Sequence, residues 1–156
     1  MVDSKSYKRS QVTKQSKTST ISDYRKSNQS SLELKGPIEN LLLKKLNKFG
    51  IVSLPKSADI LKYEVGDEFK RHSDNGYPYE YRYRTCIIQL TDISEYDGGE
   101  LEIYNKNKIT ANKTLGNTIL FDSSLEHSAN KILKGTRYCL VMWLEKKHFG
   151  FDNTII

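Results

Sequence analysis

The sequence predicts a mainly β fold, an antiparallel sandwich or jelly roll with a helix packed against it near the N-terminus. From residue 58 onward the chain is typical of about eight short strands, separated by turn signals and with no helical pattern between them. At 156 residues the chain is long enough for one domain with a sizeable core. We expect a single domain over residues 21–156, with the jelly-roll core at about 58–147.

Residues 1–20 are rich in Ser, Thr, Lys and Gln, and we expect them to form a basic, flexible leader. The first 30 residues hold seven Lys or Arg and two Asp, so they carry +5 of the net charge of +6. The folded part is nearly neutral, which argues against a nucleic-acid partner except through the leader. The leader lacks the apolar stretch of a secretory signal, and no run reaches the roughly 18 apolar residues of a membrane span. We therefore expect a cytoplasmic protein with no membrane contact.

Ordered structure is expected to begin within residues 21–35, with an edge strand, and to continue with one helix over residues 36–50. Pro37 stands where a first helical residue belongs, and Gly50 stands just past the last turn. An apolar face predicted to pack on a sheet follows the helical period: Ile38, Leu42, Leu46 and Phe49, with Leu41 beside them.

The strands that follow alternate with breaks rich in Gly, Asn, Asp and Pro. We expect strands at 58–64, 68–74, 83–91, 100–105, 107–111, 117–122, 125–131 and 136–145. Cys86 and Cys139 lie inside apolar runs of these strands, which favours buried, reduced thiols over a disulfide.

A histidine and an aspartate lie two positions apart at the end of the strand 68–74. In an extended strand His72 and Asp74 leave the same face, so an imidazole and a carboxylate lie side by side. This is half of a facial triad of two histidines and one carboxylate, the arrangement of non-haem Fe(II) sites, or else a surface pair. Of the two other histidines, His148 follows the last strand, whereas His127 begins a strand that can reach the mouth of a jelly roll. His127 is the candidate third ligand.

Arg137 begins the most apolar strand, ten residues after His127. An arginine that enters an apolar strand needs an anionic partner, because burying it alone costs several kcal/mol. A dicarboxylate co-substrate is one such partner, held through a bidentate contact. An Asp or Glu at the rim of the fold is the other.

These segments resemble the Fe(II)/2-oxoglutarate-dependent dioxygenases, in particular their prolyl 4-hydroxylase-like branch. The resemblance covers roughly residues 55–147 and rests on YEVGDEFKRHSDN, YRYRTCIIQLTDISEYDGGELEIYN and GNTILFDSSLEHSANKILKGTRYCLVMWLE, in the order of the family. It implies a double-stranded β-helix, which is a jelly roll, with one or more N-terminal helices packed on it.

The resemblance also implies roles for single residues. His72, Asp74 and His127 would bind Fe(II). Arg137 would pair with the far carboxylate of 2-oxoglutarate, Tyr63 would donate a hydrogen bond to the same co-substrate, and Thr85 would line its pocket. Tyr63 has a structural alternative as a core aromatic with a satisfied hydroxyl.

Two further residues match positions that face a peptide in the family. Arg82 would contact the peptide substrate and Trp143 would lie near the substrate proline. Trp143 has core packing as its alternative, and a one-residue shift of register would exchange Arg82 with Arg84. Gly98 and Gly99 match a tight turn with no chemical role.

The chain also departs from the family pattern in three places. The collagen-type relatives use Lys at the position of Arg137, some relatives place a co-substrate-binding tyrosine at Gln89, and Cys139 replaces a residue that is often small or aliphatic. Trp143 replaces the second arginine of nucleic-acid demethylases, which argues against that activity. The carboxylate Asp74 favours hydroxylation over halogenation.

The function that the resemblance implies is hydroxylation of peptidyl proline, with Fe(II), 2-oxoglutarate, O₂ and ascorbate as cofactors and co-substrates. The tyrosine-rich segment NGYPYEYRY after Asp74 suits a lid over a proline-containing peptide or protein. A free amino acid or another protein side chain is the alternative substrate, and a metal-binding jelly roll without enzymatic activity is the remaining alternative.

Overall fold

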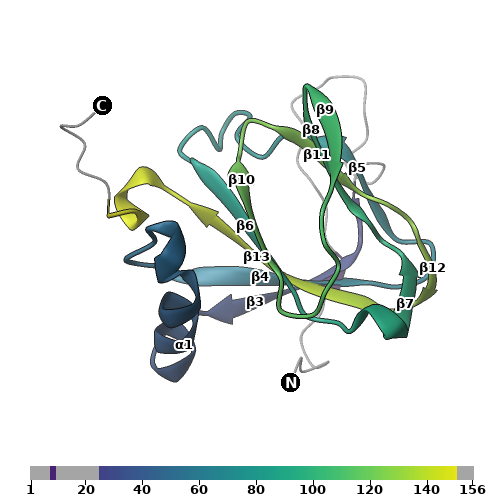
Figure 1. The fold of residues 1–156 in the computed structure, drawn as a ribbon, viewed down its shortest axis with the longest axis horizontal. Helices are drawn as coiled ribbons and strands as arrows, with labels where there is room; N and C mark the ends of the chain where they lie inside the picture. The colour runs from purple at the N-terminus through teal and green to yellow at the C-terminus, as the bar shows by residue number, and fades with distance from the viewer. Residues whose placement is uncertain (1–7, 10–24, 151–156) are drawn as a thin grey trace.

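Two antiparallel sheets packed face to face form the molecule, so the predicted jelly-roll class is confirmed (Figure 1). The structure is a computed structural model that describes residues 8–9 and 25–150. The first sheet has the strand order β1 (Lys8–Arg9), β3 (Asn28–Glu33), β4 (Ser57–Tyr63), β13 (Arg137–Leu144), β6 (Arg84–Gln89) and β10 (Thr118–Asp122). The second has the order β2 (Arg25–Lys26), β5 (Glu68–His72), β11 (Glu126–Ala129), β8 (Leu101–Asn105) and β9 (Asn107–Thr110).

The predicted edge strand is β3, which pairs with β4 over six residue pairs. It is itself paired on its other side with β1, through Lys8 opposite Gln29 and Arg9 opposite Asn28. The remainder of the predicted flexible leader, residues 1–7 and 10–20, lies outside the described residues.

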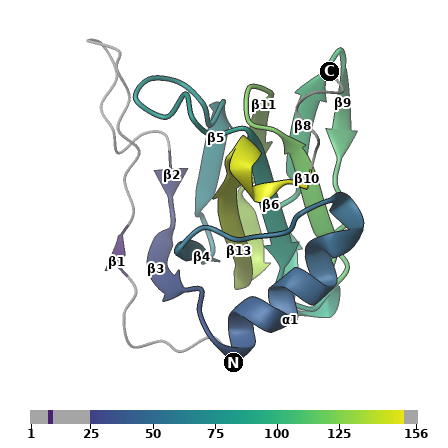
Figure 2. The same ribbon diagram turned by 90° about the vertical axis from the view of Figure 1, so that its left-hand side faces the viewer.

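Helix α1 (Pro37–Leu46) lies across the outer face of the first sheet, as predicted (Figure 2). Pro37 is its first residue, and a short 3₁₀ turn, η3 (Asn47–Phe49), extends it to Gly50, whose φ of 81° is the left-handed conformation that glycine adopts easily. Leu42 and Leu46 are buried against the sheet. The prediction for Leu41 was wrong: it is 64% exposed, and Leu43 packs against the core instead.

The two faces of the first sheet serve two separate cores because alternate residues of β13 point to opposite sides. Leu140, Met142 and Leu144 pack under α1, whereas Cys139 and Val141 point between the two sheets. A strand that is buried on both faces has apolar residues at successive positions, which explains the long apolar run of β13. Cys86 and Cys139 are buried without a disulfide, as predicted.

The strands differ from the predicted ones at the closed end of the roll. The strand predicted over 125–131 ends at Ala129, and the chain then forms β12 (Ile132–Gly135), paired with a strand that was not predicted, β7 (Tyr96–Gly98). Gly98 and Gly99 have φ of 79° and 68°, and Gly99 donates its N–H to the carbonyl of Lys131. These glycines make the turn that the sequence predicted, and Gly98 is also the last residue of β7 in the small sheet.

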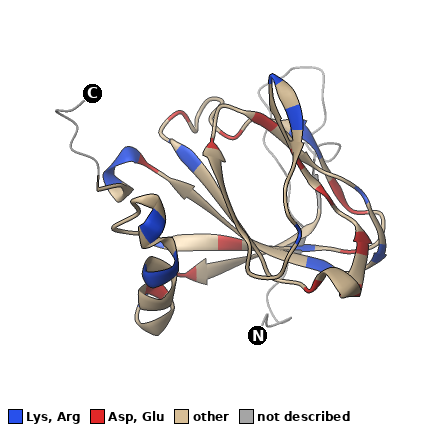
Figure 3. Cartoon of the chain, viewed as in Figure 1, with Lys and Arg blue, Asp and Glu red and all other residues tan. Residues whose placement is uncertain are grey.

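The charged side chains are spread over the described part of the molecule with both signs intermixed (Figure 3). This agrees with the net charge of +1 that residues 31–156 carry. Among the described residues, no helix is both long enough and apolar enough to cross a membrane.

Candidate metal centre and adjoining pocket

His72 and His127 lie directly opposite each other on the paired strands β5 and β11. The strand that was predicted over 68–74 ends at His72, so Asp74 belongs to the following loop. The N–H of Asp74 donates to the carbonyl of Ser123 over 2.9 Å, and this contact returns its side chain toward the two histidines. The three predicted ligands therefore meet at one place.

The distances among these three side chains suit a shared metal ion. Asp74 Oδ1 lies 3.3 Å from His72 Nε2, and Asp74 Oδ2 lies 3.3 Å from His127 Nε2. One ligand atom from each residue falls within 4.8 Å of the others. The donor set of two imidazoles and one carboxylate is the one that non-haem Fe(II) sites use.

Backbone carbonyls fix the ring orientation of both histidines. Nδ1 of His72 lies 2.6 Å from the carbonyl of Lys70, and Nδ1 of His127 lies 3.0 Å from the carbonyl of Leu125. A carbonyl only accepts, so each Nδ1 carries the hydrogen and each Nε2 presents its lone pair to the site. Lone pairs that converge with a carboxylate are unfavourable unless a cation lies between them.

The pKa values of these groups favour the same protonation state. Burial lowers the pKa of His72, and the nearby imidazole of His127 lowers it further. Burial acts to raise the pKa of Asp74, but the two imidazoles that face it outweigh burial and hold the pKa well below its usual range. A neutral imidazole and an ionised carboxylate are the forms that bind metal.

Thr85, on β6, is adjacent to the metal centre and fixes the carboxylate. Its hydroxyl donates to Asp74 Oδ2 over 2.7 Å and lies 3.0 Å from Ser123 Oγ. Thr85 also lines a pocket beside the three candidate ligands. The hydroxyl of Ser123 was not predicted, and nothing in the sequence pattern singles it out.

A pocket extends from the metal centre between the two sheets. Its walls are largely apolar and come from both sheets: Leu61, Tyr63, Phe69, Thr85, Ile87, Leu101, Ala129, Arg137, Cys139, Val141 and Trp143, together with the three metal-binding candidates. Phe69 stacks on the His72 ring at a centroid distance of 3.5 Å. The pocket joins the predicted iron ligands to four predicted binding residues, namely Tyr63, Thr85, Arg137 and Trp143.

Arg137 is 1% exposed at the first position of β13. Its Nε and Nη2 donate to Gln89 Oε1 over 3.3 and 3.1 Å, and its guanidinium lies 5.3 Å from the centre of the Tyr63 ring. Within residues 25–150 no Asp or Glu forms an ion pair with it. The rim carboxylate that the sequence left open is therefore not observed in that range.

Arg82 does not line this pocket, but it lies between two aromatic rings, one of which, Trp143, does. Its guanidinium is 3.9 Å from the centre of the Tyr79 ring and 3.8 Å from that of Trp143, and Nη1 donates to the carbonyl of Asp74 over 3.3 Å. Arg84 faces away and pairs with Asp122 over 3.0 Å. The register therefore brings Arg82, and not Arg84, to the metal centre.

A family model described as the 2OG-Fe(II) oxygenase superfamily matches residues 58–145, which is more than half of the chain. The chain belongs to this superfamily. A PKHD-type hydroxylase of Gloeothece citriformis is 31% identical over 126 residues, which cover 77% of this chain and 57% of that protein. The chain spans about half the length of the curated relatives that it matches.

Solved structures share the fold of this chain. A prolyl-4-hydroxylase of Pseudomonas putida superposes with a TM-score of 0.65 at 15% identity, over 79% of this chain and 73% of the other. A prolyl hydroxylase of Trichoplax adhaerens, solved with a peptide fragment of the hypoxia inducible factor oxygen degradation domain, gives 0.69 at 15% identity, over 90% and 71%. The implied double-stranded β-helix is confirmed by these likenesses.

The third histidine of the chain is not part of this site. His148 is buried in the 3₁₀ turn η5 (Lys146–His148), where its Nδ1 accepts the N–H of Glu145 over 2.9 Å. The sequence analysis preferred His127 because His148 follows the last strand, and the group of candidate ligands in the structure does not include His148.

Proposed function

We propose that this chain is a Fe(II)- and 2-oxoglutarate-dependent hydroxylase that acts on peptidyl proline. The observation that carries the proposal is the shared pocket, which is lined by a candidate metal-binding triad and by the buried Arg137. No Asp or Glu of residues 25–150 forms an ion pair with Arg137. A 2-oxo dicarboxylate has complementary groups, a chelating keto acid and a distal carboxylate.

In this proposal His72, Asp74 and His127 hold Fe(II), and Arg137 with Tyr63 binds the distal carboxylate of 2-oxoglutarate. Fe(II) with 2-oxoglutarate and O₂ supplies the oxidative decarboxylation that drives C–H hydroxylation, and ascorbate keeps the iron reduced. Asp74 occupies the carboxylate position of the triad, which favours hydroxylation over halogenation.

The chain orients these groups and keeps water away from them. Thr85 restrains the carboxylate of Asp74 through the 2.7 Å hydrogen bond, so that both of its oxygens stay directed at the histidines. The apolar side chains of Ile87 and Val141 line the pocket and lower its polarity. The reducing, cytoplasmic setting stays part of the proposal, and the two buried thiols are compatible with it.

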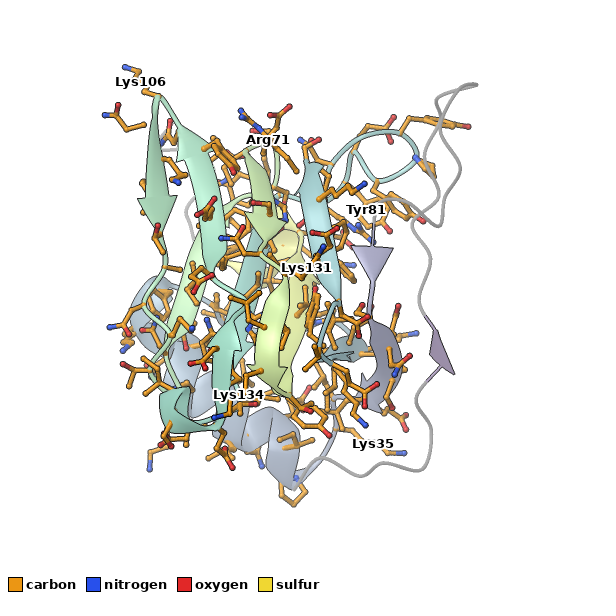
Figure 4. The ribbon with its side chains drawn as sticks, turned by 90° about the vertical axis from the view of Figure 1, so that its right-hand side faces the viewer. Lys35, Arg71, Tyr81, Lys106, Lys131 and Lys134 are labelled. Carbon is orange, nitrogen blue, oxygen red and sulfur yellow. The ribbon has the colours of Figure 1, made fainter. Side chains whose placement is uncertain are left out.

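Side chains in and near the pocket support a peptide substrate. Buried Arg82 Nε and Trp143 Nε1 have no hydrogen-bond partner within the described chain, and peptide carbonyls could accept from both. Tyr81, which is 56% exposed, lies at the same end of the molecule as Arg71 and at the opposite end from Lys134 (Figure 4). Exposed aromatic rings beside a pocket suit stacking on proline. The Trichoplax adhaerens relative, solved with a peptide, supports the same class.

Turnover of 2-oxoglutarate to succinate tests the proposal, measured with Fe(II) and ascorbate and with or without proline-containing peptides. We expect peptide-stimulated succinate and an oxygen atom added to proline, with both lost in His127→Ala and Arg137→Ala. Succinate that no peptide stimulates would redirect the substrate to a free amino acid or another side chain. Iron binding without succinate would leave a metal-binding jelly roll and overturn the enzymatic proposal.

Arg82→Ala tests the substrate-facing assignment, and Arg84→Ala is its matched control because that guanidinium faces Asp122. We expect Arg82→Ala to lower peptide-stimulated turnover by about tenfold or more, the loss of one or two hydrogen bonds to a charged group. Arg84→Ala should change it less than twofold. Equal effects of the two substitutions would contradict a specific role for Arg82.

A further inference from the structure

Strand β5 holds one residue more than its partner β11 beside the candidate metal centre. His72 lies opposite His127, whereas Phe69 lies opposite Ala129, so three steps along β5 match two steps along β11. An arrangement in which two residues oppose one is a β-bulge. Bulges are frequent next to active sites, where they change the direction of a side chain.

The bulge determines which side chains of β5 face the pocket. In a regular strand, residues three apart point to opposite faces. Phe69 and His72 nevertheless both line the pocket, and their rings stack at a centroid distance of 3.5 Å. The two residues between them, Lys70 and Arg71, are both exposed. The bulge therefore directs His72 inward.

A regular pairing of the same two strands would reverse this direction. If the pairing next to Phe69 continued without the bulge, Arg71 would lie opposite His127 and point into the pocket. His72 would then point to the outer face of the sheet, because a slip of one residue moves a side chain to the other face. The metal centre would lose a ligand.

Arg71 is held on the outer face by contacts with the next two strands. Its Nε donates to Glu126 Oε2 on β11 over 2.5 Å, and its guanidinium lies 3.8 Å from the centre of the Tyr104 ring on β8. Glu126 and Tyr104 lie opposite each other. The Tyr104 hydroxyl is also 3.2 Å from Oγ of Ser128, the residue of β11 that the bulge faces. These contacts join β5, β11 and β8 beside the two histidines.

The charge of Arg71 favours the same register. In the regular register its guanidinium would enter a pocket with largely apolar walls, and burial of an unpaired charge is strongly unfavourable. The Arg71–Glu126 pair is half exposed, at 55% and 53%, and exposed pairs contribute little to global stability. Between the two registers, however, only the bulged one leaves this charge paired and solvated.

We propose that Arg71 is a positioning residue that selects the bulged register of β5 and so directs His72 to the metal. Glu126 and Tyr104 are its partners in this role. The inference rests on the proposed function, in which His72 binds Fe(II).

Arg71→Leu tests the inference, because leucine can lie in the pocket and cannot pair with Glu126. We expect the affinity for Mn(II), measured by competition with a chelating dye, to fall by at least about tenfold, since only molecules with His72 directed inward bind normally. In the metal-free protein, the nuclear Overhauser effect between the Phe69 and His72 rings should disappear. Arg71→Lys keeps a charge that disfavours the pocket, so it should retain both signals. Wild-type affinity and an intact ring contact in Arg71→Leu would overturn the inference.

Arg84→Leu is the matched control. Arg84 also pairs across strands, with Asp122 over 3.0 Å, and its guanidinium lies 3.8 Å from the centre of the Tyr83 ring. The ladder of β6 and β10 keeps one register over its five residue pairs, so no bulge depends on this contact. This substitution should leave the Mn(II) affinity unchanged. A loss equal to that of Arg71→Leu would contradict a specific role for Arg71.

Deletion of Lys70 separates the choice of register from any other effect of Arg71. The shortened strand has no surplus residue, and regular alternation directs both Phe69 and His72 to the pocket. In this background Arg71→Leu should no longer change the Mn(II) affinity. A loss as large as in the undeleted strand would mean that Arg71 does not act through the register, and the inference would be wrong.

The outcomes separate the inference from the proposed function. If the wild-type protein binds no Mn(II), the metal centre fails and the proposed function fails with it. If the wild-type protein and Arg71→Leu bind Mn(II) equally well, the proposed function stands and the inference is wrong.

Discussion

Among the three candidate ligands, Asp74 is the only anionic one. It lies in a loop, so its side chain needs other contacts to hold it in place. Four contacts compensate for this position: the N–H to the Ser123 carbonyl, the hydroxyl of Thr85 and the two facing imidazoles. The hydrogen bond from Thr85 can be removed without changing any of the three candidate ligands.

Thr85→Val removes that hydroxyl and nearly preserves the side-chain volume. We expect metal affinity to fall by about tenfold or more, since partners that orient a ligand commonly account for 10–100-fold. Competition with a chelating dye, with Mn(II) as the probe, measures it. Thr85→Ser keeps the hydroxyl and should retain affinity. Thr91→Val removes a hydroxyl that accepts from Tyr138 N, far from the ligands, and should also retain affinity. Equal losses in the Thr85→Val and Thr91→Val variants would contradict the role of Thr85.

At the scale of elements, α1 stabilises the first sheet through one apolar face. Leu46 is fully buried, whereas Leu41, one turn away on the same helix, is 64% exposed. Leu46→Ala should lower the free energy of unfolding by about 2–5 kcal/mol, and Leu41→Ala by no more than about 0.5 kcal/mol. Urea denaturation of both variants measures the difference. Similar losses would mean that α1 does not pack as described.

The turn between β7 and β8 requires a residue without a side chain at Gly98. A Cβ at Gly98 would lie 2.2 Å from the carbonyl oxygen of Lys131, whereas one at Gly66 would meet nothing within 4 Å. Both glycines have positive φ, so both alanine variants carry backbone strain of about 1–2 kcal/mol. Only Gly98→Ala must also move the backbone, and we expect it to be the more destabilising by at least about 1 kcal/mol in thermal unfolding. A larger loss in Gly66→Ala would contradict this.

The elements that the sequence predicted are those with a strong local pattern. The helix has Pro37 and Gly50 at its ends and an apolar period between them, and β13 has a long apolar run. Strand β7 has three residues and contains Gly98, so its residues resemble a turn, and only its pairing with β12 makes it a strand. Leu41 and Leu43 lie on opposite edges of the apolar face, and the sheet beneath decides which is buried.

At the scale of the whole molecule, the two sheets bring together residues from six separate strands and loops. The metal ligands come from the second sheet and the loop after it, whereas Arg137, Tyr63 and Thr85 come from the first. The sequence predicted the triad from the close spacing of His72 and Asp74, the position of His127 and the family resemblance, although Asp74 lies in a loop and not on the strand. It did not predict the contacts of Tyr96 with Arg137, since these depend on how a small third sheet closes the end of the roll.

The absorption spectrum of the protein with Fe(II) and 2-oxoglutarate, recorded without oxygen, tests the central claim most directly. A 2-oxo acid that chelates Fe(II) gives a charge-transfer band in the visible region. We predict a saturable band that requires both components, reaches one equivalent of each, and disappears in His127→Ala although this variant stays folded. A wild-type protein that shows no band at saturating Fe(II) and 2-oxoglutarate would contradict the assignment of His72, Asp74 and His127 as an iron site for this co-substrate.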